Sequence, residues 1–452
     1  MPAPAHRDGA GALKRSLFPA SAWVFACAAL ARPSVAATPG DAHVLAQTVA
    51  PPDSAAPAIH GPLTLERALR LALEHHPNLT ERTWATRAEV ARARDEARAP
   101  NPTLEASYEN FGGSMPPVLG EKTLSLAQPL DFLGRRRGLR DVAKALDREG
   151  TATIEATRRE ILRQTAVAFL DSWQLEQRVD LLQRAEANSQ AAIDAARERT
   201  RIGAAPITEA LRAESEWAQR GIERRRSQAD LASARRLLAL QWGAHEATFD
   251  SLILDLPSAL PDSGRWGGAL ANQPEMREAR AQSAVAAARV RAAKAGRIPE
   301  LTALAGVRHL AEGSVTGWIA SLSAPIPLWN RQESAIAAAE AEQKAAQAHE
   351  TLVQLELEQR LGEVQDRAEA ARTAYDLARN RAEPAAREAL TQLESGYRRG
   401  RFTYLDILEG RRTLLDIQLA ELEAQRDYWA ARLELQSWIG LAPGSPTIPE
   451  GR

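Results

Sequence analysis

The chain has 452 residues, more than one hydrophobic core usually accommodates, so its length predicts two or more structural units. Lys and Arg (57) nearly balance Asp and Glu (58), which excludes a protein drawn to nucleic acid by a large positive net charge. Aromatic residues make up only 5%, while Ala, Arg, Glu, Leu and Gln dominate long stretches; this composition is typical of long helices packed side by side.

Residues 1–37 have the pattern of a secretory signal peptide. Basic residues near the start precede an apolar run, Leu17 to Leu30, that is too short to span a membrane, and small residues at 34–37 permit cleavage. The alternative is lipoprotein processing at Cys27, although the residues before it fit that motif badly. Because Cys27 is the only cysteine, ordinary cleavage leaves a mature chain without an internal disulfide.

Three further segments are predicted to connect or flank the folded parts. Residues 38–61 are rich in Pro, Ala and small polar residues and should form a flexible lead, the segment 246–271 a linker, and 442–452 a tail. The mature chain has no run of 18 apolar residues, which argues against a membrane-spanning helix. A membrane location would therefore require strands closed into a barrel.

The two halves of the chain repeat with a constant offset of 197 residues. Between the predicted strands Pro129 matches Pro325, an offset of 196, so one residue is gained or lost there. The sequence therefore predicts a first repeat over 62–245 and a second over 272–441, each with a helix, a strand pair and a long helical hairpin. The landmarks that coincide are Pro77 with Pro274, Pro102 with Pro299, Leu104 with Leu301, Gly203 with Gly400, Leu211 with Leu408, and Gly243 with Gly440.

Each repeat opens with a helix of moderate length. In the first repeat Asn78 is the expected N-cap, with Glu81 three residues on as in a capping box. In the second repeat the helix is expected over about Pro274 to Ala295. Prolines shortly after the expected ends stop both helices.

Segments with a period of two follow each opening helix. Apolar and polar residues alternate strictly in Leu104 to Glu109, and Leu301 to Val307 and Trp318 to Ala324 follow the same period less strictly. This period predicts strands with one apolar and one polar face, of a length (about 8–10 residues) that suits a tilted crossing of a bilayer. Taken singly, each strand also fits a half-buried sheet in a soluble domain.

Very long helices complete each repeat. No proline interrupts Arg137 to Thr200, and a leucine-rich seam runs from Leu405 to Leu433. Each rod is expected to turn back near Gly203 or Gly400, since glycine tolerates the left-handed conformation that ends a helix. Coiled-coil packing is predicted, and sixty helical residues would span roughly 90 Å. The apolar residues that recur every seven positions in the first rod are Ile154, Ile161, Ala168, Leu175 and Leu182.

The sequence thus predicts a mainly α chain with a small membrane β-part and an internal two-fold repeat. Four strands per chain are too few to close a membrane barrel, whose smallest members have about eight. Three copies would supply twelve strands and twelve rod helices, so trimerisation is the expected assembly, although counting alone also leaves twofold and fourfold assemblies open.

Two segments resemble the TolC family of outer-membrane factors, or outer membrane efflux proteins. Leu63 to Pro77 is similar to the opening of these proteins and Tyr397 to Leu408 to their second hairpin tip, with Gly203 to Leu211 as the counterpart in the first repeat. The resemblance covers roughly residues 63–441. It implies a homotrimeric duct in which a twelve-stranded β-barrel among outer-membrane lipid continues as a helical barrel in the periplasm. It also implies that the tips meet a periplasmic adaptor (membrane fusion protein) and an inner-membrane RND-type transporter.

The resemblance further implies which residues form a gate. Asp406 and Glu409 match carboxylates that line the constriction, and Tyr397 and Glu209 match a pair that holds the closed state. Because Asp406 and Glu409 are three residues apart, they share one helix face, and threefold symmetry would turn each into a ring that favours cations. The alternative is that both are ordinary solvated positions on a charged helix.

The turns of the two hairpins are the expected contacts with the adaptor or the pump. In the best-known family member an arginine helps to hold the closed state, and its position falls here on Phe402. Arg401 is adjacent, but its side chain would point in another direction on a helix. The residues expected at the tips are Arg201, Gly203, Arg399, Gly400 and Arg401.

The segment Gln128 to Arg137 resembles the Gln-Pro-Leu…Gly-Lys-Arg form common in the heavy-metal-efflux branch of the family, which includes the cobalt–zinc–cadmium ducts. It is expected to follow the second strand, with a glycine for a sharp strand-to-helix exit; a solvated basic turn is the alternative. The resemblance implies a passive exit duct for heavy-metal cations in a tripartite efflux system. A multidrug or type I secretion duct of the same fold, and a periplasmic coiled-coil adaptor, are the alternatives.

No residues suggest catalysis, a cofactor or a resident metal. Adjacent side chains on a helix diverge by about 100°, so His75 and His76 make a poor metal site. A Gly-rich phosphate loop and a nucleophile elbow are both missing. The sequence therefore argues against an enzyme, since an exported enzyme built on a helical bundle would need a polar cluster in a cleft, and none can be identified.

Overall fold

A computed structural model of the chain describes residues 59–109, 120–131, 134–254, 270–311 and 313–438. The expected signal peptide and tail, nearly all of the expected lead and most of the expected linker lie outside the described residues. No described helix combines the length and the apolar character that crossing a membrane requires.

The first repeat has the order of elements that the sequence predicts, preceded by a short strand and a short helix. Its long helix has 67 residues, which corresponds to roughly 100 Å. In chain order the elements are β1 (Leu63–Thr64), α1 (Leu65–His75), α2 (Pro77–Glu96), β2 (Thr103–Glu109), β3 (Glu121–Leu130), α3 (Arg135–Arg201) and α4 (Ile207–Leu240).

The second repeat follows the same plan, but its long helix is interrupted. A π-helical turn, Ala378–Ala382, separates two α-helical segments, and Pro384 is the second residue after it. The predicted opening helix is confirmed. In chain order the elements are β4 (Leu252–Ile253), α5 (Pro274–Ala295), β5 (Leu301–Leu310), β6 (Val315–Ser323), α6 (Glu333–Leu377), α7 (Glu383–Arg398) and α8 (Tyr404–Trp438).

The four longer strands form one antiparallel sheet with the order β2-β3-β5-β6. Leu104 pairs with Leu126, Leu124 with Val307 and Val307 with Trp318, so each repeat supplies one hairpin and β3 joins β5 across the repeats. Within the described residues β2 and β6 each have a strand neighbour on one side only. Large apolar side chains of these edge strands are exposed in the single chain, Leu104 by 68% and Trp318 by 82%.

Two local expectations were wrong. The N-cap of α2 is His76, whose ring nitrogen Nδ1 accepts a hydrogen bond from the backbone N of Asn78 at 3.2 Å. Pro77 occupies the first helical position, where its missing N–H costs nothing, so the helix begins before Asn78. Gln128 to Leu130 belong to β3 instead of following it. The partner strand β2 begins at Thr103, opposite Ala127, so Pro129 has no β2 partner and needs no donor on that side.

The geometry at the start of α3 explains why the segment Gln128 to Arg137 contains a glycine and an acidic residue. Gly134 has φ +86°, and the carboxylate of Asp131 accepts hydrogen bonds from the backbone N of Gly134 and Arg135 at 3.1 Å and of Arg136 at 2.7 Å. These hydrogen bonds keep the pKa of Asp131 below its ordinary value, although burial opposes them. Arg136 also pairs, at 2.7 Å, with Glu300, the residue before β5, and so connects the repeats.

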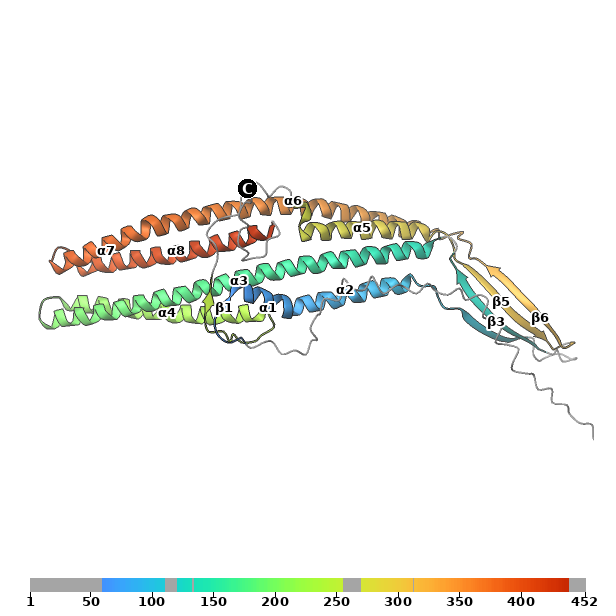
Figure 1. Cartoon of the computed structure of the whole chain (residues 1–452), viewed down its shortest axis with the longest axis horizontal. Helices are drawn as coiled ribbons and strands as arrows, with labels where there is room; N and C mark the ends of the chain where they lie inside the picture. The colour runs from blue at the N-terminus through green and yellow to red at the C-terminus, as the bar shows by residue number, and fades with distance from the viewer. Residues whose placement is uncertain (1–58, 110–119, 132–133, 255–269, 312, 439–452) are drawn as a thin grey trace, which may run out of the picture. The chain divides into compact units, whose positions relative to one another are not determined.

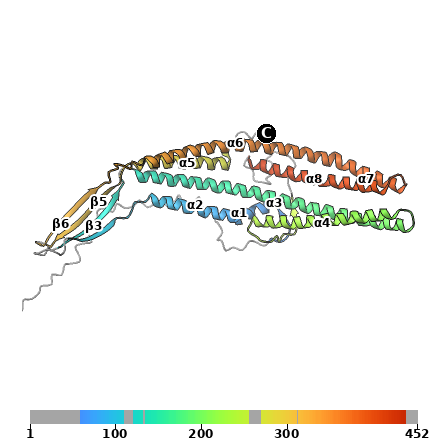
Figure 2. The same cartoon turned by 180° about the vertical axis from the view of Figure 1, so that it is seen from behind.

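The helices pack along α3, which contacts α4 over one part of its length and α2 and α5 over the other (Figures 1 and 2). The predicted heptad seam is only partly buried. Ile154, Ile161 and Leu182 are buried, whereas Ala168 and Leu175 are half-buried. A straight α-helix has 3.6 residues per turn, so a seven-residue pattern drifts around it. The buried positions in the middle of α3 shift accordingly, to residues such as Phe169.

The main hydrophobic core lies where α1 and the small parallel sheet of β1 and β4 cover α3 and the end of α4. Leu63 and Phe169 are fully buried there, together with Trp242. The backbone N of Ile59 donates to the hydroxyl of Thr248 at 2.8 Å, which ties the start of the described chain to the segment after α4. This core joins residues of both repeats, since α8 also contributes to it.

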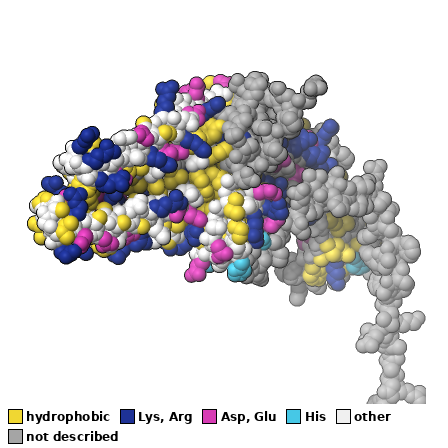
Figure 3. All heavy atoms as spheres, turned by 60° about the vertical axis from the view of Figure 1, so that its left-hand side comes forward, with side chains coloured by type: hydrophobic (Ala, Val, Ile, Leu, Met, Phe, Trp, Pro, Cys, Tyr) yellow, Lys and Arg dark blue, Asp and Glu magenta, His cyan; other side chains and the backbone are white. Residues whose placement is uncertain are grey.

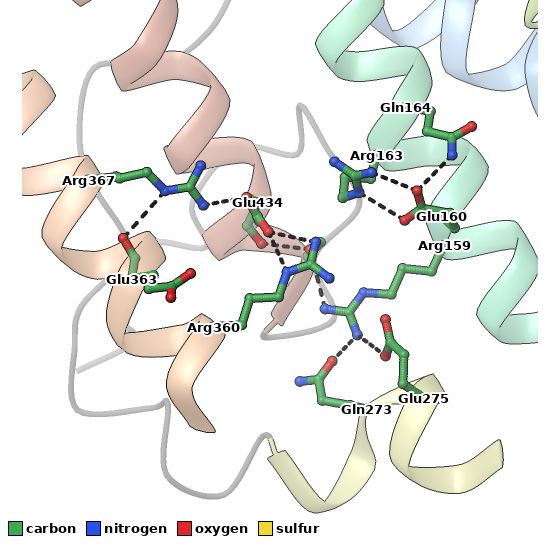
Figure 4. A network of polar contacts seen from close by, with 11 residues as sticks. Arg159, Glu160, Arg163, Gln164, Gln273, Glu275, Arg360, Glu363, Arg367 and Glu434 are labelled. Atoms are coloured by element: carbon green, nitrogen blue, oxygen red, sulfur yellow. Dashed lines mark hydrogen bonds and ion pairs between the residues drawn. The ribbon is translucent and has the colours of Figure 1, made fainter. Parts of the chain in front are cut away.

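A polar network makes a second connection between the repeats (Figure 4). Arg159 on α3 contacts Gln273 and, at 3.2 Å, Glu275 on α5. The amide Nε2 of Gln273 donates to the carbonyl of Trp438 at 2.8 Å, so a side chain from the start of α5 caps α8 at Trp438. Glu434 on α8 pairs with Arg360 on α6 at 2.9 Å. The ends of the two shorter helices are thus fixed against the two long ones.

The close approach of β3 and β5 gives a test of the sheet. A Cβ added at Gly306 would lie 2.5 Å from the carbonyl oxygen of Leu124 and 2.7 Å from the Cβ of Ser125, whereas nothing lies within 4 Å of one added at Gly317 on β6. We expect Gly306→Val to destabilise the protein by about 2 kcal/mol or more through overpacking. Thermal unfolding in detergent, followed by circular dichroism, measures the difference. Gly317→Val is the matched control, and equal melting temperatures for the two variants would contradict this packing.

Candidate gate at the hairpin tips

The two helical hairpins reverse direction at glycines, as predicted. Gly203 has φ +76° and Gly400 φ +74°. In the first turn the backbone N of Ala204 donates to the carbonyl of Arg199 at 2.8 Å, and in the second the N of Arg401 donates to the carbonyl of Gly396 at 2.9 Å. These six-to-one bonds, with a left-handed glycine, are the Schellman ending of a helix. The same local chemistry therefore closes both hairpins.

The structure brings Tyr397 and Glu209 together, although 188 residues separate them. The Tyr397 hydroxyl on α7 donates a hydrogen bond to the Glu209 carboxylate in the first turn of α4. The guanidinium carbon of Arg199 lies 4.4 Å from the centre of the Tyr397 ring. Burial and the Glu209 carboxylate raise the pKa of Tyr397 well above its ordinary value, so the phenol remains a hydrogen-bond donor at neutral pH. This contact links the two hairpins.

Asp406 and Glu409 lie near the start of α8, and both line one shallow groove between α7 and α8. The Asp406 carboxylate accepts hydrogen bonds from the backbone N and the hydroxyl of Thr403, at 2.7 and 2.8 Å. In return the backbone N of Asp406 donates to the Thr403 hydroxyl at 3.3 Å, which completes a capping box. These hydrogen bonds lower the pKa of Asp406. The other residues that line the groove are Ala386, Ala389, Leu393, Gly410 and Thr413.

Phe402 has a local packing role. A Cβ added at Gly396 would lie 2.3 Å from the Phe402 ring, so the glycine makes room for that ring. Phe402 is 44% exposed and covers the end of α7. Among the expected tip residues, Arg201 pairs with Glu198 on its own helix, with Nε 2.8 Å from the carboxylate, and both side chains face solvent.

Sequence reasoning missed two residues of this site. Thr403 had a visible signal, because a threonine followed three residues later by an acidic residue is the pattern of a capping box. Arg199 had none, since it is one of many arginines on a charged helix and its contact with Tyr397 depends on the other hairpin. In the described part of the chain no three or more His, Cys, Asp or Glu side chains are placed to hold a metal ion.

The capping box can be tested without reference to transport. We expect Thr403→Val to accelerate hydrogen exchange in the first turn of α8, because the Asp406 amide loses its acceptor. Acidification below the lowered pKa of Asp406 should reduce the protection of the Thr403 amide, measured relative to the intrinsic exchange rate at the same pH, since protonation removes its carboxylate acceptor. Hydrogen exchange with mass spectrometry measures both effects. Thr413→Val on the same helix is the control, and unchanged exchange at residues 404–407 would contradict the assignment.

Comparisons with known proteins agree with this architecture. The family model described as "Outer membrane efflux protein" matches residues 68–244 and 267–441, one match for each repeat. The cobalt-zinc-cadmium resistance protein CzcC of Cupriavidus metallidurans is 24% identical over 84% of this chain and 90% of its own length. The nickel-cobalt-cadmium resistance protein NccC of Alcaligenes xylosoxydans is 28% identical over 64% of this chain and 66% of its own length.

The fold also has solved relatives. The crystal structure of the outer membrane protein VceC from Vibrio cholerae superposes with a TM-score of 0.72, at 20% identity, over 84% of this chain and 96% of that one. A likeness at this level of identity concerns the fold. Since the family model covers both repeats and most of the chain, this protein belongs to the outer membrane efflux protein family.

Proposed function

We propose that the protein is the passive exit duct of a tripartite efflux system, working as a homotrimer with a periplasmic adaptor and an inner-membrane RND-type pump. The observation that carries this proposal is the family match over both repeats, on a chain whose sheet has two open edges. The helical part would lie in the periplasm and the sheet among outer-membrane lipid.

The open edges support assembly from several chains. An unpaired strand edge presents free N–H and C=O groups and joins other strands readily. If β6 of one copy pairs with β2 of the next, three copies close one sheet of twelve strands and leave no edge. The exposed apolar side chains on these strands, such as Leu104 and Trp318, suit contact with lipid better than contact with water.

The tips have the surface expected of a docking region. Ile202, Ile207 and Phe402 are exposed there, by 61%, 66% and 44%. Figure 3 views this end of the molecule and shows basic side chains gathered around a strip of hydrophobic ones. Arg201 is the last residue of α3, directly before the first turn, and Arg401 lies in the second turn. Apolar and basic groups together favour a protein partner with apolar and acidic side chains, as an adaptor would supply.

We further propose that the cargo is a heavy-metal cation. The curated relatives carry cobalt, zinc, cadmium and nickel in their names, and the Gln128 to Arg137 segment resembles the heavy-metal branch. In a trimer Asp406 and Glu409 would form two carboxylate rings at the narrow end, and Tyr397 with Glu209 would hold the closed state. Carboxylate rings concentrate cations in a pore.

Deletion of the gene tests the cargo. We expect greater sensitivity to zinc, cobalt, cadmium and nickel salts, and no change toward a panel of dyes and antibiotics, because only metal cations would lose their exit. Growth inhibition is the measurement, with the wild-type gene restored on a plasmid as the control. Sensitivity to drugs alone would favour the multidrug duct of the same fold, and a soluble periplasmic monomer in cell fractions would favour an adaptor instead.

Replacement of the two carboxylates tests the gate. We expect Asp406→Ala with Glu409→Ala to raise single-channel conductance in planar bilayers, because the smaller side chains widen the constriction, and to reduce the preference for cations, because both rings lose their charge. Glu214→Ala removes an exposed carboxylate of the first hairpin, which pairs with Arg197 at 3.4 Å, and is the control. Conductance and selectivity equal to those of the wild type would remove both residues from the gate.

A further inference from the structure

The contact between Tyr397 and Glu209 lies at one end of a longer polar zone between the hairpins. On α4, Glu216 follows Glu209 by seven residues, and on α8, Arg411 follows Tyr404 by seven residues. Seven residues are two helical turns, so both members of each pair face the same way. Glu216 and Arg411 therefore lie two turns above the tips, Glu216 on the helix α4 that carries Glu209 and Arg411 on α8, which pairs with α7 in the second hairpin.

The groups at this second level are half-buried and incompletely paired. The side chain of Glu216 is 13% exposed, and its ion pair with Arg220 on the same helix is long, at 3.8 Å. Arg220 also pairs more closely with Glu223, at 2.8 Å. One guanidinium nitrogen of Arg411 pairs with Glu394 at 3.1 Å, whereas its Nη1 is buried without a hydrogen-bond partner. A buried charge that lacks a close partner is unfavourable and gains free energy from forming one.

Tyr404 connects the two levels. Its ring lies 6.1 Å from that of Tyr397, and its hydroxyl is buried without a hydrogen-bond partner. Burial first, and then the charge of Glu216, raise the pKa of Tyr404 to about 12, while Arg411 opposes the rise. Burial also raises the pKa of Glu216, which the positive charges of Arg220 and Arg411 oppose. The phenol, the carboxylate and the guanidinium thus lie within electrostatic reach of one another.

Glu216 and Arg411 also line the same groove between the hairpins. This groove has a volume of about 550 Å³ and lies between α3 and α4 on one side and α7 and α8 on the other. Small residues of α3, among them Ala185 and Ser189, form part of its wall. The groove thus leaves open space beside both charged groups, on the face where α8 and α4 approach each other.

We propose that Glu216 and Arg411 form a second pair between the hairpins, one heptad above Tyr397 and Glu209, which retains the second hairpin on the first after the tip contact breaks. This inference rests on the proposed tip gate. The tip would then open in two stages, first at Tyr397 and then at Arg411. The hydroxyl of Tyr404 supplies an additional donor for Glu216 when the pair closes.

A double-mutant cycle in planar bilayers tests the two stages. We expect Tyr397→Phe to raise the open probability of the channel, and Glu216→Gln or Arg411→Gln alone to change it by less than about twofold. Each combination with Tyr397→Phe should exceed the product of the single effects by at least about threefold, whereas Glu216→Gln and Arg411→Gln together should add little to either one. Independent effects of Glu216→Gln and Arg411→Gln would overturn the pairing.

A disulfide cross-link provides a second measurement, which does not depend on the gate. Cys27 is the only cysteine of the sequence, so introduced cysteines can be followed against a simple background. We expect Glu216→Cys with Arg411→Cys to cross-link under mild oxidation and to reverse the effect of Tyr397→Phe until a reductant is added. Glu214→Cys with Arg411→Cys is the matched control, because Glu214 pairs with Arg197 on α3 instead.

The outcomes separate the inference from the proposed function. If Tyr397→Phe leaves the open probability unchanged, the tip gate fails, and the cross-link still decides whether the second pair exists. If Tyr397→Phe opens the channel but the cysteine pair at 216 and 411 cross-links no better than the control, the second pair is absent and the inference is wrong.

Discussion

A helix of 67 residues cannot remain in water with an uncovered apolar stripe, and this constraint organises the molecule. No other described helix is long enough to cover α3 by itself, since α4 has 34 residues and α2 has 20. Shorter helices therefore lie along it in succession, and each contributes its own apolar face. The second repeat meets the same requirement, because its long helix α6 is covered by α5 and α8.

Covering a long helix with short ones creates helix ends in the middle of the structure, where unpaired backbone groups are costly. The network around Arg159 resolves one such place. Gln273 caps the last carbonyl of α8, and Arg159 holds Gln273 and Glu275 in position. Burial lowers the pKa of Arg159, yet the nearby Glu275 carboxylate compensates part of its desolvation. Removal of Arg159 would take this ion pair from the Glu275 carboxylate, which costs more than the pair itself contributes.

Much of the fold could be predicted because its signals are local. The turns at Gly203 and Gly400, the helix over Pro274–Ala295 and the alternating strands depend on residues within a few positions of one another. The N-cap of α2 failed for a local reason as well, since Pro77 sets the start of the helix more strongly than a polar residue at 78 does. Local chemistry, where it is read correctly, fixes most of the secondary structure.

The candidate site could be predicted only in part, because its contacts join distant segments. Tyr397 and Glu209 were identified through the family resemblance, and no feature of either helix alone pairs them. Arg199, Glu216 and Arg411 gave no signal, since a charged residue on a charged helix looks the same whether it faces solvent or another hairpin. Such positions become visible only when the packing of the hairpins is known.

The two hairpins use one repeated position in different ways. At the offset of 197 residues Glu209 corresponds to Asp406, and Pro206 corresponds to Thr403. Thr403 binds Asp406 and keeps that carboxylate on its own helix, whereas Pro206 has no hydroxyl and forms no side-chain cap, so Glu209 is free to reach Tyr397. The same position thus has two structural roles: Asp406 caps the start of its own helix, and Glu209 connects the first hairpin to the second.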